Sequence, residues 1–124
     1  IIENTKNNTG MTLTLALSYG GKQEIFKAVK EISEKVKNDI IFLDNFDDSV
    51  INDHLYTRNL PDVDLLIRTS GEQRISNFLL WQIAYAELYF TDIYWPDFTE
   101  KDFTKAIIEY QNRERRFGKT SKQL

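Results

Sequence analysis

The chain has 124 residues, 41% hydrophobic and 28% charged, a composition typical of one globular domain that excludes disordered and fibrous classes. The absence of cysteine excludes a disulfide framework, a thiolate zinc site and a cysteine nucleophile. The net charge of −3 argues against nucleic-acid binding. Residues 112–124 nevertheless carry +4 and the rest therefore −7, which suggests that the basic end meets an anion or an acidic neighbour.

No apolar run approaches the roughly 18 residues of a membrane span, and no signal peptide opens the chain. We therefore expect no transmembrane segment and a cytoplasmic location, with peripheral contact to a membrane as a further option.

The first third of the chain predicts a strand, a turn and a helix. Residues 11–18 alternate leucine or methionine with small or polar residues, the two-residue period of a strand. Residues 18–21 break that pattern with Tyr19 and two glycines. Apolar residues then recur at helical spacing, with lysine and glutamate on the other face; they are Ile25, Phe26, Val29, Ile32 and Val36.

The rest of the chain continues the alternation of helices and strands. Asp47 or Asp48 is expected to cap a short helix, residues 63–67 and 88–91 to form strands, and Ser76 to cap a helix through residue 86. Thr99 and Asp102 resemble a capping box for a last helix that ends near Gly118. This order predicts an α/β protein with a parallel sheet flanked by helices. Three strands are few, so a partner chain or a further segment is expected to complete the sheet.

The polar segment 68–76 is the first candidate site. It lies between a buried strand and a predicted helix start, the edge at which open α/β sheets bind ligands. Arg68, Arg74, Ser76 and free helix N–H groups suit a phosphate or diphosphate. The alternative is structural: either arginine pairs with Glu72 or Asp64, and Ser76 is a plain cap.

Glu87 is the second candidate because it is the only charged residue between residues 78 and 90. A lone carboxylate in apolar surroundings needs a cation or several donors. Mg²⁺, which is held by one or two carboxylates and by substrate phosphates, would serve. Pairing with an arginine, or a place at the sheet rim, is the alternative.

Three further features are ambiguous or unremarkable. The amides of residues 19–22 could approach an anion, but tight packing explains two glycines equally well. His54 has no second ligand nearby and is expected to be a surface residue. Residues 112–118 suit either a solvated helix end or an anion at a subunit interface.

Three stretches then show a resemblance to a known family. RTSGEQRISNFLLWQ (residues 68–82), AYAE (84–87) and WPDF (95–98) resemble the signature of cis-prenyltransferases, most closely the bacterial undecaprenyl diphosphate synthases or isoprenyl transferases. The resemblance extends from about Asn7 to Gly118.

The resemblance implies condensation of isopentenyl diphosphate with an allylic, farnesyl-type diphosphate, dependent on Mg²⁺, in a homodimer. It assigns isopentenyl diphosphate binding to Arg68, Arg74 and Ser76, and the Mg²⁺-linked carboxylate to Glu87. Arg116 and Gly118 match the family's terminal Arg-x-Gly element, which reaches the diphosphate near or across the dimer interface.

Two departures from the family pattern affect what we expect of this chain. Ser18 and Lys22 stand where the family has Asn and Arg, which predicts a retuned loop. The family's amino-terminal Asp-Gly-Asn-x-Arg-Trp element, with its essential aspartate, is absent. Residues 1–124 are therefore expected to be the carboxyl-terminal half of one cis-prenyltransferase domain, with half a site and no activity alone. The alternative is a non-catalytic partner subunit, which the retained Arg68, Arg74, Ser76 and Glu87 disfavour.

Overall fold

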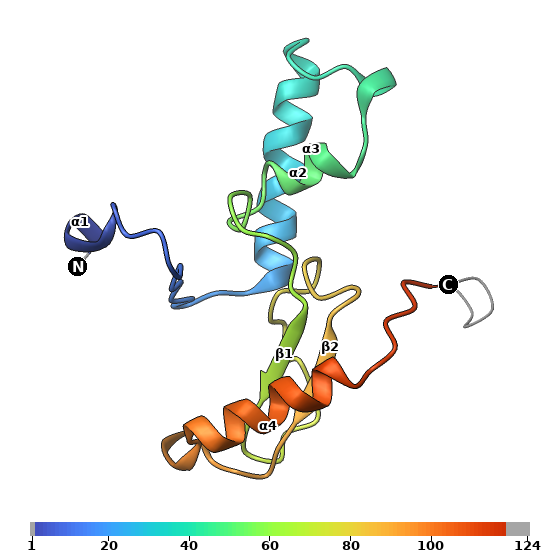
Figure 1. Ribbon diagram of the computed structural model, residues 1–124. Coiled ribbons are helices and arrows are strands. Elements are labelled where there is room, and N and C mark those ends of the chain that lie inside the picture. Colours follow the sequence, from blue (N-terminus) through green and yellow to red (C-terminus); the bar gives the residue numbers. More distant parts are fainter. Residues whose placement is uncertain (1, 119–124) are drawn as a thin grey trace.

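The structure is a computed structural model that describes residues 2–118. Its centre is a two-stranded parallel sheet of β1 (Leu65–Arg68) and β2 (Glu87–Phe90). Leu65 pairs with Glu87 and Arg68 with Phe90, so the strands are in register over their whole length. Helix α2 stands to one side of this sheet with α3 beside it, and α4 crosses the strands at the other end (Figure 1). The predicted parallel α/β class with flanking helices is confirmed.

Helix α2 (Gly21–Lys37) confirms the predicted helix, but its buried side coincides only in part with the expected apolar stripe, of which Ile32 is buried. Its buried side chains are Glu24, Ala28 and Ile32, which are spaced four residues apart and so lie on one line. The expected apolar stripe included Phe26 and Val29, which are 73% and 56% exposed. These side chains are open because the described chain places no layer over that side of the helix.

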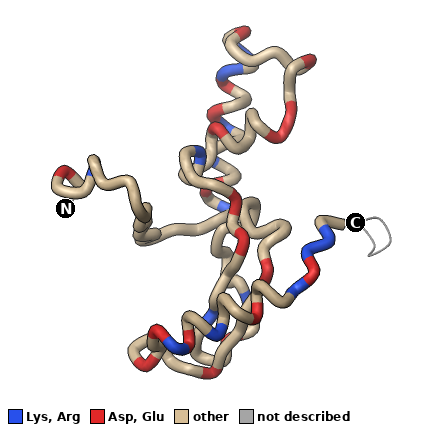
Figure 2. The backbone as a smooth tube through the Cα atoms, in the orientation of Figure 1, with Lys and Arg blue, Asp and Glu red and all other residues tan. Residues whose placement is uncertain are grey.

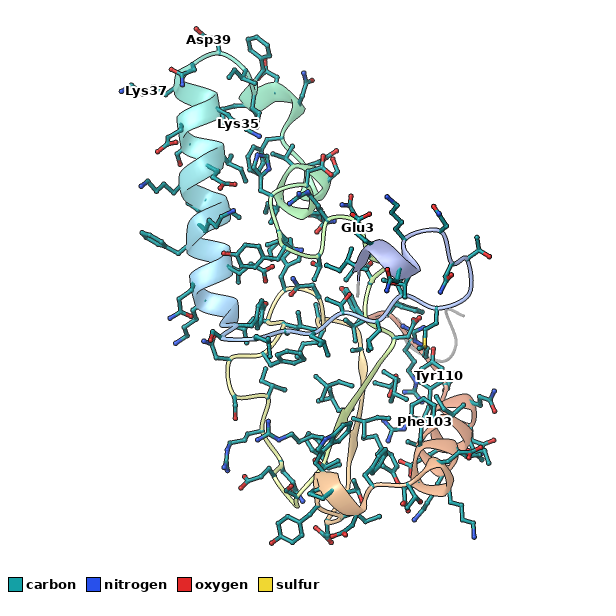
Figure 3. The ribbon with its side chains drawn as sticks, turned by 90° about the vertical axis from the view of Figure 1, so that its left-hand side faces the viewer. Glu3, Lys35, Lys37, Asp39, Phe103 and Tyr110 are labelled. Atoms are coloured by element: carbon teal, nitrogen blue, oxygen red, sulfur yellow. The ribbon has the colours of Figure 1, made fainter. Side chains whose placement is uncertain are left out.

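The two short capping predictions are confirmed. Helix α3 (Asp48–Asn52) begins after Asp47, whose carboxylate accepts the N–H of Ser49 at 2.9 Å. Helix α4 (Glu100–Gln111) begins after Thr99, whose N–H and hydroxyl both donate to Asp102 at 2.9 and 2.6 Å. Figure 3 shows Phe103 and Tyr110 on the side of α4 that lies toward the strands. Two 3-10 turns, Leu43–Asn45 and Trp95–Asp97, and a short α1 (Ile2–Thr5) complete the described elements.

The predicted strand over residues 11–18 is wrong for the described chain. The segment runs extended away from the sheet (Figure 1), and no strand of residues 2–118 pairs with it. Met11, Leu13, Leu15 and Leu17 are 74–84% exposed. The alternation is present, but a strand also needs the backbone groups of a neighbour, and none of the described residues supplies them.

The predicted helix over residues 76–86 is also wrong. The crossover from β1 to β2 consists of turns instead, with positive φ at Ser76 (47°), Asn77 (64°) and Leu79 (46°). A right-handed helix excludes this backbone conformation. Ser76 is therefore no helix cap.

The last helix is shorter than predicted. It ends at Gln111, and Asn112 closes it with backbone bonds to Ile108 and Glu109. Gly118, the expected terminator, lies in a later turn with φ of 77°. Among the described residues, no helix is both long and apolar enough to cross a membrane.

Candidate functional site

The first part of the candidate site is the loop that leaves the carboxyl end of β1. The amides of Ser70 and Gly71 donate to the carbonyls of Ile93 and Thr91, each at 2.9 Å, so the chain after β2 holds this loop. A Cβ on Gly71, whose φ is 69°, would lie 3.0 Å from the Asp92 carboxylate, so a larger residue would be strained at this position. Beside the loop is a hollow of about 440 Å³; its lining residues are Ile67, Arg68, Thr69, Ser70, Trp95, Phe98 and Phe103.

The structure places Arg68, Arg74 and Ser76 on this one loop at different points. Arg68 ends β1 and lines the hollow, and within residues 2–118 its side chain enters no ion pair. Arg74 and Ser76 are exposed further along, and Arg74 pairs with Glu72. The structural alternative thus holds for Arg74 in this structure, although a pair so open to water is easily exchanged for a stronger anion.

The glycine turn before α2 packs closely against the same loop. The N–H groups of Gly21 and Lys22 donate to the backbone oxygen and the side-chain Oδ1 of Asn77, at 2.7 and 2.9 Å. A Cβ on Gly21 would lie 2.8 Å from Leu80 Cγ. Of the two alternatives left open by the sequence, the structure supports tight packing, because these two amides already have protein partners.

A buried hydrogen-bond network, which was not predicted from the sequence, attaches the crossover between β1 and β2 to α2 at a second point. Glu24 is 1% exposed and accepts bonds from the Tyr19 hydroxyl, the Tyr56 N–H (2.7 Å) and Gln82 Nε2 (3.0 Å). The same Gln82 nitrogen donates to Thr57 Oγ1 at 2.9 Å. The signal that could have found it is the spacing of Glu24 with Ala28 and Ile32, which places a carboxylate on the buried line of α2.

Burial raises the pKa of the Tyr19 hydroxyl well above its ordinary value of 10.0, and the bond to Glu24 raises it further. The folded state therefore holds this proton more tightly than the unfolded state does. Its contribution to stability is complete below about pH 10 and is lost as pH rises beyond that value.

We accordingly expect the unfolding free energy to fall between about pH 9 and pH 11.5 more steeply in the wild type than in Tyr19→Phe. Urea unfolding of both proteins across this range measures the effect. Parallel pH profiles would contradict it.

Glu87 and Arg68 lie at opposite ends of the parallel strands: Glu87 at the amino end of β2 and Arg68 at the carboxyl end of β1. It begins β2 and pairs with Leu65, three residues before Arg68, which separates the two positions by roughly 10 Å along the strands. Its carboxylate accepts Arg113 Nη1 at 3.0 Å, and its side chain is 25% exposed. The carboxylates of Glu109 and Glu87 raise the pKa of Arg113. Pairing with an arginine, the alternative reading of Glu87, is what this structure shows.

The described residues contain no cluster of metal-ligating side chains. No three histidine, cysteine, aspartate or glutamate side chains gather among residues 2–118. Glu87 fits Mg²⁺ as one ligand, because this ion commonly uses one or two carboxylates together with water and substrate phosphates. His54 is no ligand here, since its ring contacts the Val50 carbonyl (2.6 Å) and Lys35 Nζ (2.8 Å).

The described part of the basic end, residues 112–118, lies near Glu87 rather than near Arg74. Arg115 donates to Asp64 at 2.5 Å and to the Tyr110 hydroxyl at 3.0 Å, and these bonds hold the segment at the amino end of the strands. Arg116 pairs with Glu114 at 2.9 Å and is 55% exposed, and Gly118 has open space around it. Figure 2 shows this concentration of positive charge along an outlying segment. The structure does not bring Arg116 or Gly118 to the loop of Arg68.

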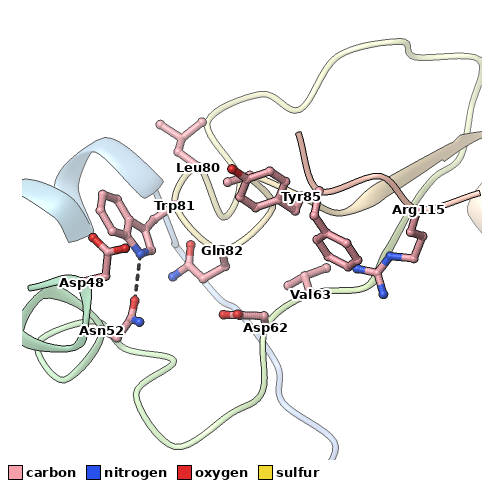
Figure 4. A pocket seen from close by; sticks show the side chains of 11 residues that line it. Asp48, Asn52, Asp62, Val63, Leu80, Trp81, Gln82, Tyr85 and Arg115 are labelled. Atoms are coloured by element: carbon pink, nitrogen blue, oxygen red, sulfur yellow. Dashed lines mark hydrogen bonds between the residues drawn. The ribbon is translucent and has the colours of Figure 1, made fainter. Parts of the chain in front are cut away.

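Two other hollows lie outside the loop 68–76, and Trp81 lines both of them. One, of about 390 Å³, is lined by Asp62, Trp81, Tyr85 and Arg115, with Trp81 bonded to Asn52 at 2.8 Å (Figure 4). The other, of about 570 Å³, is an apolar groove between α2 and α3 that includes Ile32, Val36 and Phe46.

A parallel sheet with a cationic, glycine-containing loop at the carboxyl end of a strand defines an α/β protein with a candidate anion site. Residues 1–118 match the family described as "Putative undecaprenyl diphosphate synthase". The chain therefore belongs to the undecaprenyl diphosphate synthase family of prenyltransferases.

Named relatives and solved structures agree with this family. The chain is 58% identical over 116 residues to a ditrans,polycis-undecaprenyl-diphosphate synthase of Haemophilus influenzae, covering 94% of this chain and 48% of that protein. It is 55% identical to an isoprenyl transferase of Clostridium perfringens, covering 94% and 46%. The crystal structure of lavandulyl diphosphate synthase from Lavandula x intermedia, in complex with dimethylallyl diphosphate, is similar with a TM-score of 0.87 at 42% identity, covering 93% and 50%. The chain spans about half the length of these relatives.

Proposed function

We propose that residues 1–124 are the carboxyl-terminal half of one cis-prenyltransferase domain and carry its half-site for isopentenyl diphosphate. The observation that supports this most is the loop 68–76: Arg68 ends β1 and lines a hollow with aromatic walls, and Arg74 and Ser76 are exposed further along the same loop. The Haemophilus relative is named as specific for farnesyl diphosphate, which supports an allylic diphosphate as the second substrate.

In this proposal the two guanidinium groups bind the diphosphate oxygens and the Ser76 hydroxyl donates a further bond. Holding isopentenyl diphosphate in one orientation presents its alkene to the allylic carbon and removes most of the entropy cost of a two-substrate reaction. Phe98, Phe103 and Trp95 would keep water from the cation-like carbon that forms.

Mg²⁺ would supply charge neutralisation at the departing diphosphate, with Glu87 as one of its ligands. Arg113 contacts Oε2 of Glu87, so Oε1 is the oxygen that would bind the ion.

We further propose a homodimer in which Arg116 and Gly118 contribute to the partner's diphosphate site. The exposure of both residues, away from the loop of Arg68 in their own chain, supports such a role. We also propose a cytoplasmic location with peripheral contact to a membrane, because the polyprenyl product would be strongly apolar.

The test is a product assay together with a binding measurement on the 124-residue chain. With isopentenyl diphosphate, farnesyl diphosphate and Mg²⁺, we expect no prenyl product, but saturable binding of isopentenyl diphosphate by calorimetry. Addition of the amino-terminal half of the Haemophilus relative is expected to produce activity.

Product formed by the chain alone would contradict the half-site proposal. A different result would favour the non-catalytic partner subunit: this chain raises the activity of an intact relative, and Arg74→Ala in this chain leaves that increase unchanged.

A further inference from the structure

Helix α2 begins without a cap of its own. Its N-cap position is Gly20, which has no side chain to accept the first N–H groups of the helix. Asn77 replaces that cap from a distant part of the chain: its backbone oxygen accepts Gly21 and its Oδ1 accepts Lys22. Its Nδ2 then donates to Gln23 Oε1 at 3.1 Å.

Asn77 is also suited to the backbone conformation of the loop. Its φ is 64°, and that of Ser76 is 47°, so two successive residues are left-handed. Asparagine tolerates this conformation better than most residues other than glycine. The hydrogen bonds from Asn77 to α2 offset the unfavourable backbone conformation of Ser76. Asn77 is one residue after Ser76 and three residues after Arg74 in the sequence, so these bonds restrain both neighbours.

We propose that Asn77 is a positioning residue, which fixes the loop carrying Arg74 and Ser76 onto the first turn of α2. This inference rests on the proposed binding of isopentenyl diphosphate by that loop. Asn77 is not assigned a contact with the substrate. It acts by limiting the conformations of its neighbours, so that the loop does not have to be ordered when the diphosphate binds.

The test compares the loss of this cap with the loss of another cap. Asn77→Gly removes both side-chain bonds, while glycine accepts the positive φ without strain. Asp47→Ala is the matched control, because it removes the cap of α3 and lies outside the loop. We expect both variants to lower the thermal unfolding midpoint, and only Asn77→Gly to raise the Kd for isopentenyl diphosphate, by about tenfold. Inorganic diphosphate is a second probe, and its Kd should also rise in Asn77→Gly and stay unchanged in Asp47→Ala.

Amide hydrogen exchange at residues 74–78 adds a measurement that needs no ligand. It should be faster in Asn77→Gly than in Asp47→Ala if the cap orders the loop. If Asn77→Gly does not fold, the exposed Gln23→Ala removes only the Nδ2 bond, and is expected to raise the Kd about two- to threefold.

Wild-type affinity in Asn77→Gly, with a lowered unfolding midpoint, would show a purely structural cap and overturn the positioning role alone. Failure of the wild-type chain to bind isopentenyl diphosphate would overturn the proposed half-site and the positioning role with it.

Discussion

Replacing Arg74 by alanine should weaken binding of isopentenyl diphosphate by ten- to a hundredfold and leave the fold intact. A hydrogen bond between charged groups contributes about 1.5–3 kcal/mol, which corresponds to that range of affinity. Arg74 is exposed, and among residues 2–118 its one ion-pair partner is Glu72, an interaction of about 1 kcal/mol or less. Calorimetric titration together with thermal unfolding separates the two effects.

Two variants make this prediction specific. Arg58→Ala removes another exposed arginine outside the loop and should leave the Kd unchanged. Glu72→Gln removes the carboxylate that competes for Arg74, and should tighten binding a few-fold. An equal loss of affinity in Arg58→Ala and Arg74→Ala would show a nonspecific effect of net charge and contradict the half-site.

The elements that the sequence predicted correctly are those whose determinants are local. Asp47 caps α3 by a bond to the residue two positions later, and Thr99 with Asp102 caps α4 within one turn. The strands at 63–67 and 88–91 were also predicted within one or two residues, because buried parallel strands are short apolar runs bounded by polar ones.

The elements predicted wrongly are those whose conformation depends on distant residues. Residues 11–18 alternate as a strand does, but the described chain provides no neighbour for them. The apolar residues after Ser76 suggested a helix, whereas the contacts of Asn77 and Gln82 with α2 hold that segment in turns. Contacts between residues 55 or 58 positions apart leave no periodic signal.

Arg68, Arg74 and Ser76 lie within nine residues of the sequence, which is why they could be grouped as a candidate site, and their role in binding stays a prediction. The position of Glu87 does not follow from the sequence. It depends on the register of β1 and β2, which places Glu87 at the other end of the strands from Arg68. The supporting roles of Asn77 and Gln82 become visible only in the packed structure, because their partners on α2 are 55 and 58 positions away.

Glu24→Leu is expected to cause a large loss of stability. The substitution leaves the Tyr56 N–H, the Tyr19 hydroxyl and Gln82 Nε2 without their common acceptor in a site that is 1% exposed. Each buried donor left unsatisfied costs about 1–3 kcal/mol. Because a small domain has only about 5–15 kcal/mol of stability, we expect Glu24→Leu to be largely unfolded at 37 °C. Urea unfolding followed by circular dichroism measures this loss.

A charge-neutral exchange distinguishes the network from simple helix packing. Glu24→Gln alone places one amide against another and should cost about 2 kcal/mol. Combining it with Gln82→Glu restores a carboxylate opposite an amide, so the double variant should be more stable than the sum of its single changes predicts. Glu34→Gln, on the exposed side of the same helix, should stay within about 0.5 kcal/mol of the wild type. Additive losses in the double variant would show that Glu24 and Gln82 do not act together.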